Sequence, residues 1–163
     1  MRLILVLFLF ENFACIHGWG AIGHSIVVRL AQSQLTGDAP DWILSLTPWH
    51  WEGNLSAMAS WADNILYDDT NPTGYGNWQW SRVLHYINTP DWSCNFQWER
   101  DCQNDLCVSG AINNYTKQLE TEFDHIKLTE ALYFLIHYVG DIHQPLHTGF
   151  TSDRGGNSIR GWE

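Results

Sequence analysis

Apolar residues recur at helical spacing along most of the chain. Residues 21–35 show this pattern until Gly37 and Pro40 end it, which predicts a first helix. Shorter patterns predict helices at residues 41–46 and 55–66, and the pattern resumes at residues 107–123. The strongest pattern covers residues 128–144 and predicts a long helix, with Thr129 as its N-cap and Pro145 closing it.

Residues 67–107 are instead rich in Gly, Pro, Asn, Asp and Trp. This composition predicts a long structured loop with short extended pieces, such as residues 82–88. A chain of 163 residues can bury one core, so we expect a single, mainly α-helical domain.

The first 18 residues have the features of a secretory signal peptide. Arg2 precedes an apolar run at residues 3–10, and small or polar residues follow up to Gly18. The run is too short to span a bilayer, and no later run is long enough for a membrane helix. We therefore expect a signal peptide at residues 1–18 and a mature chain at residues 19–163. The mature chain would be secreted or lie in the endomembrane lumen, without a membrane partner.

Cysteines and sequons are consistent with this compartment. Cys102 and Cys107 are close enough in sequence to close a small disulfide loop. Cys94 is then either a buried free thiol or the partner of a cysteine on chain that is absent here. The sequons at Asn54 and Asn114 predict N-glycosylation.

Charge limits how the chain meets its partners. The formal net charge is −10, so the chain lacks the basic surface of a protein that grips phosphates with lysine and arginine. If it handles phosphates, bound divalent cations would have to supply the positive charge.

Several histidines and aspartates stand among apolar residues. His137 and Asp141 are four residues apart, so they share one helix face, whereas His143 is rotated away from it. His147 follows Pro145, where the chain turns and brings this histidine back toward the same face. His24, Asp63 and His85 have similar apolar surroundings. Each residue is either a hydrogen-bonded core side chain or a ligand of zinc, which accepts such N and O donors, and spacing alone leaves both readings open.

The chain resembles the secreted, zinc-dependent, single-strand-specific nucleases of plants and fungi, also called type I or bifunctional nucleases. The matching segments cover nearly the whole mature chain: WGAIGH, WADN, LHYINTPDWSCNF, RDC, CVSGAINNYT, LTEALYFLIHYVGDIHQPLH and RGGNSI. A bacterial zinc phospholipase C family has a similar metal cluster, but HYIN and CVSGAINNYT favour the nucleases. The resemblance implies a mainly α, single-domain zinc nuclease fold and a cluster of three zinc ions.

The resemblance also implies the ligands. One zinc would be held by Asp63, His85, His137 and Asp141. A second would be held by His24, by the bridging carboxylate of Asp141, and by Trp19 through its free α-amine and carbonyl oxygen after cleavage of the signal peptide. A third would take His147 and two ligands further along the family chain. A hydroxide shared between two zincs would attack the phosphorus in line.

The implied substrate is single-stranded DNA or RNA, or a 3′-nucleotide, bound by a monomer. Tyr86 matches the family's base-stacking position, whereas the sequence without the resemblance favours a core aromatic. At the position of Asn88, fungal relatives have an aspartate that orients the nucleophile. Plant relatives have asparagine there, as this chain does. Leu66 stands where many relatives have Arg or Lys to contact the phosphate, which leucine cannot do.

Relatives continue beyond the position of Glu163, and the C-terminal part of the family fold, with the remaining ligands of the third zinc, is absent here. His147 alone is too few ligands for a stable third site, so we expect this chain to hold about two zinc ions. The partner of Cys94 would lie in the same part. Two expectations follow: a single-strand-specific endonuclease and 3′-nucleotidase, or a truncated zinc-binding form of such an enzyme that is catalytically weak or inactive.

Overall fold

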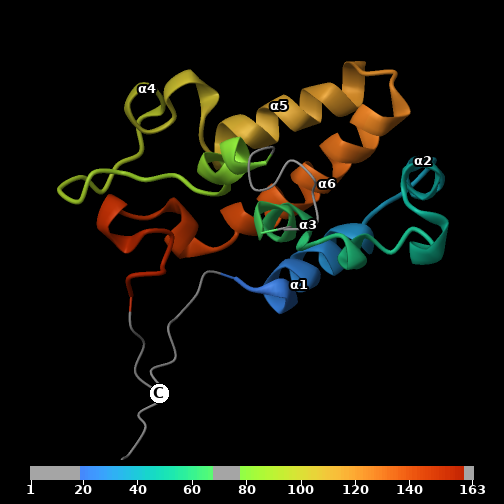
Figure 1. Ribbon diagram of the computed structural model, residues 1–163, viewed down its shortest axis with the longest axis horizontal. Coiled ribbons are helices and arrows are strands. Elements are labelled where there is room, and N and C mark those ends of the chain that lie inside the picture. The colour runs from blue at the N-terminus through green and yellow to red at the C-terminus, as the bar shows by residue number, and fades with distance from the viewer. Residues whose placement is uncertain (1–18, 68–77, 160–163) are drawn as a thin grey trace, which may run out of the picture.

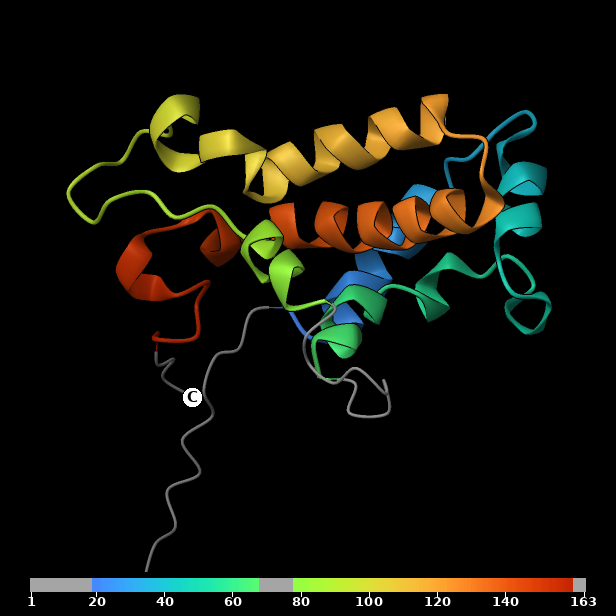
Figure 2. The ribbon, with the colours of Figure 1, turned by 45° about the horizontal axis from the view of Figure 1, so that its top comes forward.

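Two long helices, α5 (Val108–Thr121) and α6 (His125–Ile142), lie side by side, with α6 at the centre of the structure and α5 along its edge (Figures 1 and 2). The structure is a computed structural model that describes residues 19–67 and 78–159. The predicted signal peptide therefore lies outside the described residues.

Helix α6 is buried on most of its circumference. One core cluster packs Phe134 and Tyr138 of α6 against Tyr115 of α5. On the other side of α6, Leu132 and Ile136 join a second cluster built from the N-terminal third of the chain. A helix that is apolar all round is expected to be an internal one, and α6 has that position.

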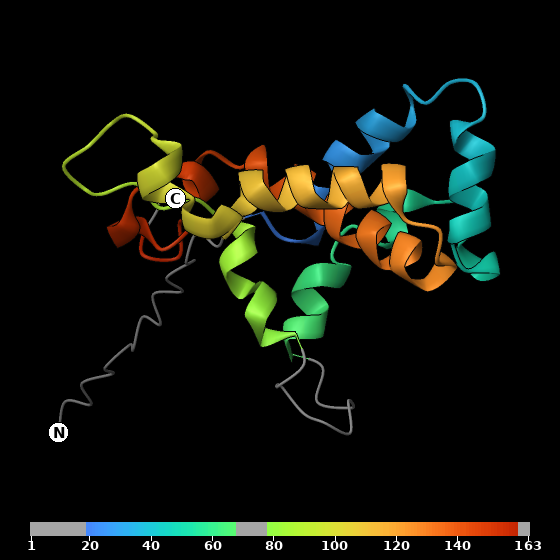
Figure 3. The same cartoon turned by 90° about the horizontal axis from the view of Figure 1, so that it is seen from above.

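The remaining elements are short and surround α6. Helix α1 (Ala21–Gln32) lies against α6, while α2 (Ala39–Leu46) and α4 (Trp98–Asp101) lie at opposite ends of the molecule in all three views (Figures 1–3). Helix α3 (Trp61–Asn64) also contacts α6. The 3₁₀-helices are η1 (Trp49–Trp51), η2 (Leu55–Ala57), η3 (Ile65–Tyr67), η5 (Gln79–His85), η6 (Gln103–Asp105), η7 (Pro145–Thr148) and η8 (Thr151–Asp153).

The prediction that α6 begins at Thr129 is wrong. The N-cap is Asp124, whose carboxylate accepts hydrogen bonds from the backbone N–H groups of Ile126 and Lys127. The Thr129 hydroxyl lies inside the helix and donates to the carbonyl oxygens of His125 and Leu46. The end of the helix is close to the prediction, because Gln144 before Pro145 has extended backbone.

A single helix over residues 55–66 is also wrong, since the segment is divided into η2, α3 and η3. In a continuous helix the Ala59 carbonyl would accept a bond from the N–H of Asp63. Here it accepts a hydrogen bond from the His137 ring at 2.7 Å instead. The break in the helix thus provides a backbone partner for a buried histidine.

Residues 82–88 are extended only in part. Residues 82–85 belong to η5, and extended backbone begins at Tyr86. From there Ile87 donates its N–H to the His147 carbonyl at 2.7 Å, and Thr89 donates to the Gly149 carbonyl at 3.0 Å. This short parallel pairing holds the segment after α6 beside the segment after η5.

The expected fold class is confirmed: the protein is mainly α-helical, and the part of the chain that the structure describes contains no β-strand beyond the isolated Thr89–Phe150 bridge. The predicted Cys102–Cys107 disulfide is present. Cys94 is a free thiol, but it is exposed rather than buried. Among the described residues, no helix has the length and apolar character needed to cross a membrane.

Candidate metal centre

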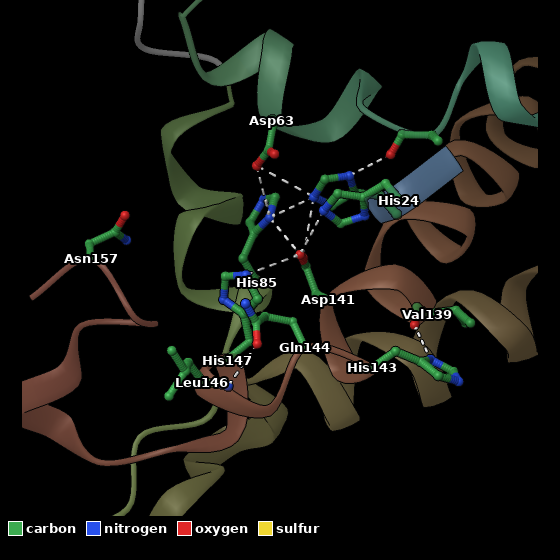
Figure 4. A network of polar contacts seen from close by, with 12 residues as sticks. His24, Asp63, His85, Val139, Asp141, His143, Gln144, Leu146, His147 and Asn157 are labelled. Atoms are coloured by element: carbon green, nitrogen blue, oxygen red, sulfur yellow. Dashed lines mark hydrogen bonds and ion pairs between the residues drawn. The ribbon is translucent and has the colours of Figure 1, made fainter. Parts of the chain in front are cut away.

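Six of the predicted ligand side chains meet at one place, although they come from five elements. His24 comes from α1, Asp63 from α3, His85 from the end of η5, His137 and Asp141 from α6, and His147 from η7. Figure 4 shows the labelled members of this set pointing toward Asp141, while His143 points away and contacts the Val139 carbonyl.

Four of these residues, Asp63, His85, His137 and Asp141, bring their ligand atoms close together. His85 Nδ1 lies 3.5 Å from Asp63 Oδ1 and 3.0 Å from Asp141 Oδ2. His137 Nε2 lies 3.4 Å from Asp63 Oδ1 and 3.2 Å from Asp141 Oδ2, and the two ring nitrogens are 3.1 Å apart. Zinc bonds of roughly 2.0–2.1 Å in tetrahedral geometry put neighbouring ligand atoms about 3.3 Å apart. These five distances are close to that spacing, and Asp63, His85 and His137 offer ligand atoms that all lie within 4.8 Å of one another.

The orientation of His137 is set by the backbone. Its Nδ1 donates to the Ala59 carbonyl, so in a neutral imidazole the lone pair is on Nε2, which faces Asp63 and Asp141. A carbonyl that accepts from the second nitrogen is the usual support of a metal-ligating histidine.

His24 and Asp141 form a second, overlapping group. His24 Nε2 lies 3.3 Å from Asp141 Oδ1, the other oxygen of the same carboxylate. The His24 ring is fully buried and stacks on the His137 ring with centroids 4.1 Å apart, yet neither of its nitrogens makes a hydrogen bond. Buried imidazole nitrogens without partners are costly, and a metal ion beside Asp141 would satisfy one of them.

Trp19 and Gly20 line the pocket that opens beside these groups. The Trp19 ring packs on Gly23, where an added Cβ would come within 2.7 Å of it. This contact packs the Trp19 side chain on α1, beside the pocket that Trp19 lines.

His147 also approaches the cluster, with Nε2 3.9 Å from Asp141 Oδ1. The hydrogen bond from Ile87 to its carbonyl fixes its position, and Gly155, with φ +67°, leaves room for its ring. The expectation that His147 turns back toward the face of His137 and Asp141 is therefore confirmed.

The electrostatics of the cluster favour the ligand forms of Asp141, Asp63 and His24, but not of His137. Burial would raise the pKa of the Asp141 carboxyl, but the His137 and His85 rings outweigh burial and lower this pKa. The same two rings lower the pKa of the Asp63 carboxyl against the effect of burial. Burial and the neighbouring His137 lower the pKa of His24 to about 4, so its ring is neutral at pH 7. Burial would lower the pKa of His137, but the two carboxylates raise it to about 10. In the metal-free protein, His137 is therefore protonated near neutral pH, and its positive charge balances the two carboxylates as a metal ion would.

A pocket of about 390 Å³ opens over the cluster and is lined by Asp63, His85, Asp141 and His147 together with Tyr86 and Leu66. Tyr86 is half-buried at this pocket, as a base-stacking residue would need to be. Asn88 is half-buried but does not line the pocket.

Two arginines at the pocket, Arg82 and Arg154, were not singled out from the sequence. Arg154 is exposed on the turn that continues into Gly155 and Gly156, all three with positive φ. The signal that marks it is the Arg-Gly-Gly sequence itself, which predicts a tight turn but not its place beside the cluster.

The sequence matches a family of known proteins. The family model described as S1/P1 Nuclease matches residues 19–161. Among similar proteins, Endonuclease 3 of Arabidopsis thaliana is 45% identical over 148 residues, covering 87% of this chain and 48% of that protein. Endonuclease 2 of the same plant is 41% identical over 98% of this chain and 55% of its own length. Nuclease P1 of Penicillium citrinum is 36% identical over 79% of this chain and 47% of its own length. The chain thus spans about half the length of the relatives that it matches.

Proposed function

The chain belongs to the S1/P1 nuclease family, and on that premise we propose that it is a zinc-dependent endonuclease. Its substrates would be the phosphodiester bonds of single-stranded DNA and RNA and the phosphate of 3′-nucleotides. The observation that supports this most directly is the set of five donor distances, 3.0–3.5 Å, among Asp63, His85, His137 and Asp141.

We assign one zinc to those four side chains, and a second to His24, Asp141 and the N-terminal backbone of Trp19. His147 would contribute to a third. When bound, zinc supplies Lewis acidity that activates water near neutral pH and stabilises negative charge on the phosphate. The chain's own residues hold the carboxylates ionised and His24 neutral, and the hydrogen bond from His137 Nδ1 to the Ala59 carbonyl keeps His137 Nε2 directed at the site.

Substrate binding would use the rim of the pocket. Tyr86 offers an aromatic face to an unstacked base, which favours single strands over duplexes. Arg154 and Arg82 would supply positive charge to the phosphates at a site where Leu66 offers none. This arrangement lets a protein with a net charge of −10 bind a polyanion locally.

The test combines metal analysis with cleavage assays. We expect the purified protein to retain zinc, and to cleave single-stranded DNA and RNA much faster than duplex DNA of the same sequence. Removal of zinc by a chelator should abolish cleavage, and zinc should restore it. A preparation with stoichiometric zinc and no cleavage of either strand type contradicts the proposed activity.

We further propose entry into the secretory pathway, cleavage after Gly18, a monomeric state and N-glycans on Asn54 and Asn114. Both asparagines are exposed, and the family model matches from Trp19 onward, which supports this assignment.

One additional residue before Trp19 is expected to lower turnover by roughly 10- to 100-fold, the range typical of disturbed metal surroundings. The reason is that an amide nitrogen cannot replace a free α-amine as a ligand of the second zinc. The measurement is kcat and zinc content of a chain beginning at Gly18 against one beginning at Trp19. Equal rates and equal zinc content would show that the terminus is no ligand.

Zinc affinity is expected to rise about tenfold per pH unit between pH 6 and 8. Because the pKa of His137 is raised to about 10 in the metal-free protein, zinc must displace one proton from this ring over the whole interval. His24, with a pKa of about 4, adds no proton competition there. Competition titrations with a chelator of known affinity measure the slope, and a pH-independent affinity would contradict the assignment of His137.

A further inference from the structure

A second pocket, of about 460 Å³, lies between α5, η5 and the loop before α5, and it shares no lining residue with the pocket at the metal centre. Its volume is in the range of sites that hold small ligands. None of the side chains discussed for catalysis contributes to it.

Asn114 of the second sequon faces this pocket. Ala111, Asn114, Tyr115 and Gln118 all line it, and their spacing of three and four residues places them on one face of α5. The acceptor asparagine is thus directed along a hollow surface. Asn54, in the other sequon, is exposed and lines neither pocket.

An aromatic side chain stands across the pocket from α5. Trp80 of η5 is 52% exposed and Leu106 is 56% exposed, so the pocket presents a sizeable apolar surface to water. A ligand with one apolar face would cover the Trp80 ring and remove that surface from water.

The polar side chains that line the pocket include carboxylates and amides. Gln118 and Glu130 line the pocket, and the Glu130 carboxylate makes no hydrogen bond or ion pair with the other described residues. Burial raises the pKa of the Glu130 carboxyl, because no cation offsets it. No lysine or arginine lines the pocket, which disfavours a nucleotide or any other phosphate and favours a neutral ligand rich in hydroxyl groups.

We propose that this pocket binds the first N-acetylglucosamine of a glycan attached to Asn114. The C–H face of the sugar would stack on Trp80, and its hydroxyl and acetamide groups would hydrogen-bond Gln118 and Glu130. The inference rests on the secretory route included in the proposed function. Because the sugar is covalently attached beside the pocket, its effective concentration is in the millimolar range, and weak individual contacts are sufficient to fill the site.

The bound sugar would connect α5 with η5. Since η5 ends at His85, a ligand of the proposed first zinc, the glycan would stabilise the segment that presents this ligand. Its effect would appear in stability, not in the chemistry of the site.

The experiment removes each glycan separately by matched substitutions at the third sequon position, Thr116→Ala and Ser56→Ala, in secreted protein. We expect Thr116→Ala to lower the Tm by roughly 2–4 °C, the shift produced by loss of one ordinary interaction in a chain of this size. Ser56→Ala serves as the control for losing a glycan at an open surface and should leave the Tm nearly unchanged. In unglycosylated protein made in bacteria, Thr116→Ala should also have no effect.

Two further arms test the contact itself. Trimming the glycans to a single N-acetylglucosamine should preserve the Tm, and Trp80→Ala should abolish the difference between Thr116→Ala and its parent. Mass spectrometry that finds Asn54 modified and Asn114 unmodified would overturn this inference alone. Equal Tm losses in both sequon variants, or a glycan effect that survives Trp80→Ala, would also overturn it. If neither asparagine is modified, the secretory route fails as well, whereas zinc content and cleavage report on the nuclease independently.

Discussion

Replacing Asp141 with asparagine is expected to remove the paired zinc ions and to reduce turnover by about 1000-fold or more. Both oxygens of this carboxylate are in use: Oδ1 lies 3.3 Å from His24, and Oδ2 lies 3.0 and 3.2 Å from His85 and His137. Asparagine keeps the shape of the side chain but loses the negative charge, and its amide nitrogen is no ligand. Since one residue serves both groups, one substitution should empty both sites.

Zinc content by elemental analysis and kcat on a single-stranded oligonucleotide measure the effect. His137→Ala should show the same loss at the four-ligand site. His143→Ala is the matched control, because this histidine follows α6 directly but is exposed and bonded to the Val139 carbonyl. Turnover close to that of the unmodified protein in Asp141→Asn would remove the metal mechanism altogether.

The pairing of His137 with Asp141 was predictable from the sequence, because residues four apart on a helix are neighbours whatever the rest of the fold does. The same holds for the rotation of His143 away from them. The approach of His24, Asp63 and His85 depends on the packing of α1, α3 and η5 against α6, which no local pattern encodes. The spacing of these residues in the sequence therefore left open whether they meet. Only the resemblance to the nuclease family predicted that they do.

The errors at element boundaries have a common physical origin. Val83, Tyr86 and Ile87 favour extended structure locally, yet residues up to His85 form a 3₁₀-helix. The period of three residues in such a helix places Ser81 and Leu84 on one buried face, so packing outweighs the local preference. In the same way, Asp124 begins α6 a full turn before the apolar pattern becomes visible, because capping requires a side-chain oxygen and not an apolar residue.

Gly140→Ala is expected to destabilise the metal-free protein by about 1–3 kcal/mol and to remove the second zinc. In a helix interior, alanine is ordinarily favoured over glycine by about 0.8–1.0 kcal/mol, so without tertiary contacts the substitution would stabilise. Here an added Cβ would lie 2.2 Å from Nδ1 of His24, and that ring is fully buried and stacked on His137. The ring would have to move away from Asp141. Urea unfolding after chelation and zinc analysis of the loaded protein measure the two effects.

The sign of the effect can be reversed by removing the ring that causes it. In a His24→Ala background the clash is absent, so Gly140→Ala should now stabilise the metal-free protein by up to about 1 kcal/mol, through helix propensity alone. The two substitutions would then show a coupling energy well above the few tenths of a kcal/mol found for independent sites. Additive effects in this cycle would show that Gly140 does not position His24, and that the close packing of α1 on α6 has another cause.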